Sequence, residues 1–225
     1  MAVCIGSPYT LGQSQAHLSS GRLGERITWT QADPLKFLES QPESAKYDVA
    51  VLAHCIWYFS SPELIIATLR LLSTRVYRIC IAEWSLSSSA FNASTHVLAV
   101  LTQAALECRR PGVQSNVRTV VSPTSIKAMA AKVGLVVQRE YFITPGEGVL
   151  DGRWEVMAVM DREFSDRINE LVEDGGEKSV VLAMKDAVEA SLKQVGGLTE
   201  VRSMDVWCAV LTLPKEAFPV LIPND

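Results

Sequence analysis

Two residues of this sequence have the types and spacing of an acid/base pair. His54 directly follows the apolar run 47–53, and Glu83 directly follows the apolar run 75–82. An imidazole and a carboxylate at neighbouring strand ends can exchange protons with a substrate. A shared apolar cleft would move both pKa values toward neutrality. We therefore predict that His54 and Glu83 are catalytic, and the alternative is a structural ion pair.

Further side chains near this pair could complete a site. His96 lies in a predicted helix with apolar neighbours, where it could point into the cleft as a catalytic proton donor; the alternative is a packed or exposed histidine. Aromatic side chains could hold a planar substrate, and an arginine could bind a substrate oxygen, although core packing would explain the aromatics equally well. The predicted substrate-binding residues are Trp57, Tyr58, Trp84 and Arg118.

The elements that must position these residues form a βαβ unit. Residues 47–53 and 75–82 are near-continuous apolar runs, typical of strands buried on both faces of a parallel sheet. Between them, Ser61 and Pro62 predict the start of a helix over 64–72. Parallel neighbours end at the same edge of a sheet, which is where open α/β sheets bind ligands. His54 and Glu83 should therefore lie side by side.

The remaining pattern predicts an α/β domain with a helical insert. Asp33 and Pro34 predict a helix start, with Asp33 as its N-cap. We predict one domain over residues 1–225, with the insert at about 161–197, before the last strand. The predicted strands are 26–31, 135–143 and 201–213, and the predicted helices are 35–40, 92–110, 122–132, 163–172 and 178–194. Residues 154–160 could be either a strand or a helix start.

Composition narrows the classes of protein that this chain could be. It has 225 residues, 48% of them hydrophobic and 20% charged, which is typical of a globular protein. The net charge of −4 gives no reason to expect nucleic acid binding, and no apolar run is long enough for a membrane span. Five cysteines without a C-x-x-C pair predict neither disulfides nor a metal site. We predict a reducing, cytoplasmic setting.

The run YDVAVLAHCIWYF at 47–59 resembles the fourth strand and following loop of class I S-adenosylmethionine (SAM) dependent methyltransferases, in a form common in fungal small-molecule enzymes. Other segments look similar to that family: 7–13, 31–35, 82–84, 96–98 and 116–120. The resemblance implies a Rossmann-like sheet, with substrate and methyl donor beside the loop after residue 53. It also implies that Asp33 is cofactor-binding, through the adenine amino group, if SAM binds at all.

The sequence departs from that family at its N-terminal side. A glycine-rich turn after a first strand, and an acidic residue ending a second, are not found here, and both normally hold the cofactor. We therefore expect a chain truncated before its cofactor site and using no cofactor. Its expected function is that of a SAM-independent cyclase or isomerase of fungal natural-product biosynthesis. The alternatives are a methyltransferase with SAM in a rebuilt or dimer-completed site, and a non-catalytic pseudoenzyme.

The same departure predicts an exposed edge on the strand at 47–53. An apolar strand edge must be covered, because it promotes aggregation. Residues 3–5 could supply a strand, the strand at 26–31 could move in, or a second copy of the chain could cover the edge. We expect a homodimer acting on a small molecule.

Overall fold

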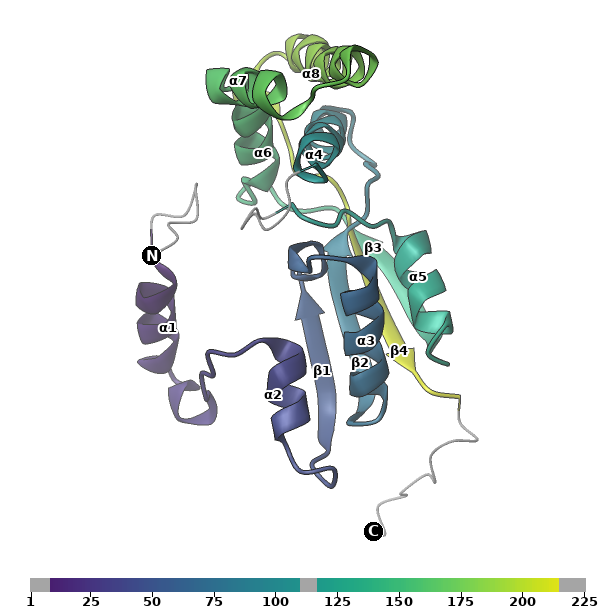
Figure 1. Cartoon of the computed structure of the whole chain (residues 1–225). Helices are drawn as coiled ribbons and strands as arrows, with labels where there is room; N and C mark the ends of the chain where they lie inside the picture. The colour runs from purple at the N-terminus through teal and green to yellow at the C-terminus, as the bar shows by residue number, and fades with distance from the viewer. Residues whose placement is uncertain (1–8, 110–116, 215–225) are drawn as a thin grey trace. The chain divides into compact units, whose positions relative to one another are not determined.

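The computed structural model describes residues 9–109 and 117–214, and it divides into two compact units, residues 1–40 and 41–225 (Figure 1). The prediction of a single domain over the whole chain stays a prediction.

The first unit contains two short helices. Helix α1 (Leu11–Ser19) begins with a capping box, in which Thr10 and Gln13 bond each other's backbone N–H groups. Helix α2 (Pro34–Ser40) has the predicted cap, since Asp33 Oδ1 accepts from the Lys36 N–H at 3.1 Å. A 3₁₀ turn, η1 (Gly24–Arg26), lies between them.

The strand predicted at 26–31 is wrong. Residues 27–31 have no strand assignment, and all four strands of the sheet come from the second unit. The prediction relied on β-branched and aromatic residues, whose preference for strands is realised only against a paired, half-buried surface. Trp29 instead donates its indole N–H to Ser19 Oγ at 2.8 Å. The predicted strand that could have covered the edge of residues 47–53 is therefore not formed.

The second unit is built on an open mixed sheet, which confirms the α/β class. Its strands are β1 (Tyr47–Ala53), β2 (Val76–Trp84), β3 (Val136–Ile143) and β4 (Val206–Thr212), in the order β1-β2-β4-β3. Strands β1 and β2 are parallel and joined by α3 (Pro62–Ser73), which confirms the βαβ unit. Strand β4 runs antiparallel to both its neighbours.

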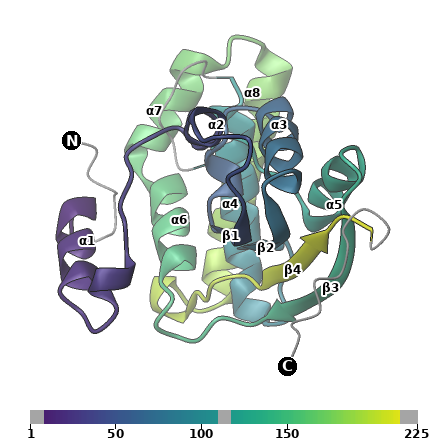
Figure 2. The same cartoon turned by 90° about the horizontal axis from the view of Figure 1, so that it is seen from below.

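Within the second unit, one face of the sheet is covered by helices and the other is partly exposed. Figure 2 shows α3 and α5 (Pro123–Ala131) on the same side of the strands. Ile79 and Ile81 face that side and are buried. On the opposite face Val51 is 67% exposed and Tyr141 is also exposed. The prediction that these strands are buried on both faces is therefore wrong for the described part of the chain.

The predicted exposed edge is present, because β1 pairs only with β2 among the described residues. Residues 3–5, one predicted source of cover, lie outside the described residues. The homodimer stays a prediction.

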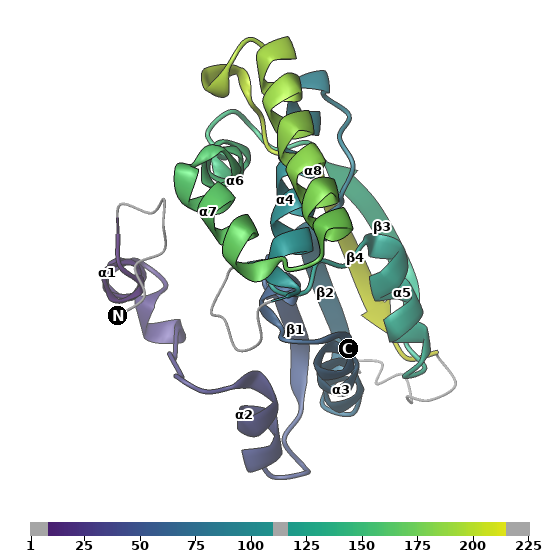
Figure 3. The ribbon, with the colours of Figure 1, turned by 45° about the horizontal axis from the view of Figure 1, so that its top comes forward.

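Four helices form a layer beyond the carboxyl ends of β1 and β2 (Figure 1). They are α4 (Ser94–Glu107), α6 (Asp151–Met160), α7 (Arg162–Leu171) and α8 (Gly175–Gln194). Helix α4 contacts both α6 and α8 (Figure 3), and the last three helices lie between β3 and β4 in the chain. Their shared core is apolar and includes Val156, Phe164, Ile168, Val181 and Val188. Residues 154–160, predicted as either a strand or a helix start, are thus helical. No described helix is long and apolar enough to cross a membrane.

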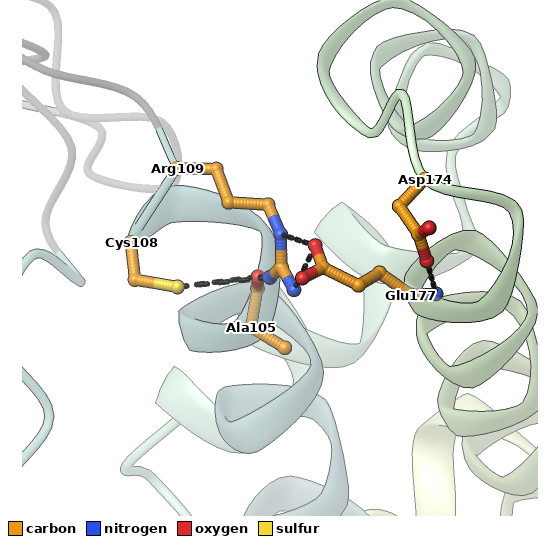
Figure 4. A network of polar contacts seen from close by, with 5 residues as sticks. All are labelled: Ala105, Cys108, Arg109, Asp174 and Glu177. Atoms are coloured by element: carbon orange, nitrogen blue, oxygen red, sulfur yellow. Dashed lines mark hydrogen bonds and ion pairs between the residues drawn. The ribbon is translucent and has the colours of Figure 1, made fainter.

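The ends of α4 and α8 are joined by a polar network (Figure 4). Arg109 donates from Nε and Nη2 to Glu177 Oε2 at 3.1 and 3.0 Å, and Asp174 Oδ1 caps α8 by accepting from the Glu177 N–H at 2.9 Å. Helix caps contribute about 1 kcal/mol, whereas exposed ion pairs contribute about 0.2–1 kcal/mol.

We therefore expect Asp174→Ala to lower the free energy of unfolding more than Glu177→Gln, which keeps the capped N–H and removes only the charge. Urea denaturation of the two variants and the wild type measures this order. A larger loss in Glu177→Gln would show that the ion pair, and not the cap, fixes this helix start.

Candidate active site

The loop after β1 bends so that His54 lies at the carboxyl end of the strand. His54 has a left-handed backbone (φ 47°), and its N–H donates to Ala82 O at 2.7 Å. Non-glycine residues rarely adopt this conformation, although histidine does so more often than most, and such outliers concentrate at functional sites. Parallel pairing places Ala53 beside Ala82, so the residues that follow each strand are brought together. The prediction that His54 and Glu83 lie side by side is confirmed.

The Glu83 carboxylate is held by backbone N–H groups. It is 1% exposed, and its Oε2 accepts from the Ile56 N–H and its Oε1 from the Trp84 N–H, both at 2.9 Å. A buried carboxylate needs such bonds to remain in place. The 3₁₀ turn η2 (Ile56–Tyr58) supplies the first of them. The sequence carried no signal for this capping, because Ile56 acts through its backbone alone.

His54 is the accessible member of the pair. Its Nδ1 lies 3.6 Å from Glu83 Oε1, and its side chain is 40% exposed whereas that of Glu83 is 1% exposed. Because Nδ1 faces the carboxylate, Nε2 is the ring nitrogen that a ligand can reach. Catalytic hydrogen bonds are often long without a bound ligand, so this separation suits a base oriented by a carboxylate.

Trp84 connects this pair to His96. The Trp84 ring lies 4.4 Å from the His54 ring and 5.1 Å from the His96 ring, centroid to centroid. His96 is fully buried, and its Nδ1 accepts from the Met204 N–H at 2.9 Å. Burial lowers the pKa of His96 from 6.5 to about 3, so this imidazole stays neutral at physiological pH.

The other predicted residues lie around the pair in different ways. Trp57 is buried and donates its indole N–H to Val121 O at 3.1 Å, while its carbonyl accepts from the Arg118 N–H at 3.0 Å. Tyr58, on the same turn, is 47% exposed and Arg118 is half-buried. Trp57 therefore supports the turn from within, whereas Tyr58 presents its ring outward. All seven predicted catalytic and substrate-binding assignments stay predictions.

Cys55 does not supply a nucleophile beside the pair. Burial, together with the nearby Glu83 charge, raises the pKa of its thiol from 9.0 to about 11. It therefore stays protonated at neutral pH. The four cysteines in the described residues are free, and residues 9–109 and 117–214 contain no cluster of three or more metal-ligating side chains.

Comparison with known proteins places this geometry in context. No family model matches the chain. It is 27% identical over 240 residues to Methyltransferase phomM' of Diaporthe leptostromiformis, and equally to Methyltransferase phomM of the same organism. The chain is similar to fungal methyltransferases. Each alignment covers 92% of this chain and 62% of the relative, so the chain spans about three fifths of the length of these relatives.

One solved structure shares the fold of this chain. A cyclopropane-fatty-acyl-phospholipid synthase-like protein from Lactobacillus casei superposes with a TM-score of 0.71 at 24% identity, covering 92% of this chain and 71% of that one. This likeness shows the fold alone, and the resemblance to methyltransferases is supported by the names of the relatives. It does not bear on the predicted truncation.

The prediction that the chain uses no cofactor is contradicted. Both curated relatives are named methyltransferases, which points to SAM, the methyl donor of the class I family, rather than to no cofactor. The prediction gave too much weight to the missing glycine pattern, although a pattern in one stretch of sequence does not decide what a whole site binds.

The described residues alone do not fit SAM. The glycines that lie between a strand end and a helix start in residues 9–109 and 117–214 are Gly146 and Gly148, between β3 and α6. Neither has positive φ, and β3 lies at the edge of the sheet opposite β1. Asp33, the predicted adenine contact, caps α2 in the first unit. The only chemical step that the described residues suggest is therefore proton transfer.

Proposed function

We propose that this chain belongs to a SAM-dependent methyltransferase that acts on a hydroxyl group of a small molecule. The observation that carries the proposal is the accessible His54 imidazole, whose Nδ1 faces the buried, doubly hydrogen-bonded Glu83 carboxylate at 3.6 Å. The 27% identity to proteins named methyltransferases supports the reaction class.

In the proposed mechanism His54 acts as the general base. Its Nε2 takes the proton of the acceptor hydroxyl, which makes the oxygen a stronger nucleophile. Glu83 keeps Nδ1 in place and stabilises the imidazolium that results, because the two backbone N–H groups hold the carboxylate there. The Trp84 ring, 4.4 Å from that of His54, limits how far the base can rotate. Tyr58 offers an exposed ring for a planar acceptor.

The cyclase or isomerase activity, the pseudoenzyme and the place in fungal natural-product biosynthesis stay predictions. An acid/base pair such as His54 and Glu83 would also suit proton transfer in an isomerase. The similarity to methyltransferases favours methyl transfer as the reaction to test first.

The test is methyl transfer itself. We expect the purified chain, incubated with SAM carrying an isotopically labelled methyl group and a panel of hydroxylated aromatic compounds, to yield a labelled methyl ether detected by mass spectrometry. Calorimetric titration with S-adenosylhomocysteine should show binding. Binding without transfer would argue for a pseudoenzyme, and conversion of an acceptor in the absence of SAM would contradict the proposal.

A further inference from the structure

The buried imidazole of His96 has one nitrogen without a hydrogen-bond partner. Its Nδ1 accepts from the Met204 N–H, so in the neutral ring the proton is on Nε2. That Nε2 is buried and has no hydrogen-bond partner in the described part of the chain. A buried donor left unsatisfied costs about 1–3 kcal/mol, so its surroundings require an explanation.

The neighbour that can satisfy this donor is the indole of Trp84. The two rings lie 5.1 Å apart at an interplanar angle of 78°, an edge-to-face arrangement. The face of an aromatic ring carries negative charge and accepts N–H donors weakly. Trp84 in turn contacts His54 at 4.4 Å with an interplanar angle of 51°. Three rings therefore form a continuous series from the buried His96 on helix α4 to the proposed base.

We propose that His96 is a positioning residue whose Nε2–H donates to the π face of Trp84 and thereby holds the indole against His54. The imidazole of His54 is then fixed on two sides, by the Glu83 carboxylate at Nδ1 and by the indole at its ring. His96 keeps its proton throughout and acts through Trp84. The consequence for catalysis rests on the proposed function, whereas the ring series itself does not.

Histidine NMR of the wild-type chain tests the ring series without any substrate. With ¹⁵N-labelled histidine, we expect His96 to stay in the Nε2–H form from about pH 5 to 8, the range in which an ordinary histidine titrates. The indole ring current should shift the Nε2 proton upfield of a hydrogen-bonded imidazole N–H, and Trp84→Leu should remove that shift. A downfield proton with a cross-peak to water would show a buried water as the partner and overturn the proposal.

Substitution of His96 tests its effect on the base. His96→Leu removes both nitrogens, so we expect it to weaken the nuclear Overhauser contacts between His54 and Trp84. His96→Asn can still accept from Met204 and donate an N–H, so it should retain more of them. His17→Leu, at an exposed position of α1, is the matched control. Unchanged contacts in a folded His96→Leu protein would overturn the proposal.

Kinetics then connect the ring series to turnover. Misplacing a catalytic group by about 1 Å can cost about 10²-fold in rate. We expect His96→Leu to lower kcat by up to about that factor with KM unchanged, and His96→Asn to recover part of it. Intact ring contacts in a wild-type protein that transfers no methyl group would refute the proposed function but not the ring series. A His96→Leu variant with wild-type kcat would refute the positioning role.

Discussion

Replacing His54 with glutamine should lower kcat/KM for methylation of a neutral hydroxyl by about 10²–10⁴-fold, the usual contribution of a general base. Glutamine keeps a polar side chain of similar length but cannot take a proton. The neighbouring carboxylate should stay in place, because Glu83 is held by the N–H groups of Ile56 and Trp84 and not by His54. Initial rates at saturating SAM, measured across acceptor concentrations, give the comparison.

A pair of acceptors distinguishes a lost base from a damaged site. A phenol whose hydroxyl is already ionised at the assay pH needs no base, so His54→Gln should slow its methylation far less than that of an un-ionised analogue of the same shape. An equal loss with both acceptors would show that His54 shapes the site without removing a proton. His17→Leu is a further control, because it removes an exposed imidazole of α1 while leaving the acid/base pair intact.

How much of this site could be predicted depends on the range of the interactions that build it. The neighbourhood of His54 and Glu83 followed from two apolar runs joined by a helix, because parallel strands end at one edge. The helix starts at Ser61 and Ser122 were equally predictable from the sequence, since each serine caps its own helix through a local hydrogen bond.

Interactions between distant segments were not predictable from the sequence. The Ile56 N–H reaches Glu83, 27 residues away, and the Met204 N–H reaches His96, 108 residues away. Backbone donors leave no trace in residue types, so no pattern could have indicated either. The strand predicted at 26–31 failed for the same reason: its residue types suit a strand, but a strand requires a partner that local sequence does not specify.

The cofactor prediction failed because it treated a local absence as a property of the whole site. The His54 and Glu83 side chains lie at the end of β1 and β2, and β1 has an unpaired edge and an exposed Val51 in the described residues. The proposed acid/base pair beside a strand with an unpaired edge is compatible with a cofactor held by groups other than those described, which agrees with the methyltransferase names of the relatives.

Replacing Phe164 with alanine should lower the free energy of unfolding by about 3–5 kcal/mol, the usual cost of removing a fully buried aromatic side chain. Phe164 is 1% exposed, and Phe164 and Ile168 are the two buried residues of helix α7, whose other side chains except Leu171 are polar. The substitution removes one of the side chains that anchor α7 in the core of the helical layer, beside Ile168 and Leu171. Equilibrium urea denaturation followed by circular dichroism measures the loss.

Phe91→Ala is the matched control, because Phe91 is 70% exposed and the same atoms are removed without opening a cavity. It should change the free energy of unfolding by less than about 0.5 kcal/mol, as surface substitutions generally do.

The helical layer is joined to the site through α4, which carries His96 against Trp84. If α7 is an integral part of that layer, the far-ultraviolet circular dichroism of the helices and the fluorescence of the tryptophans should change in a single transition in Phe164→Ala. Two separate transitions, with loss of α7 preceding the change in tryptophan fluorescence, would show that α7 docks independently and that the acid/base pair does not depend on it.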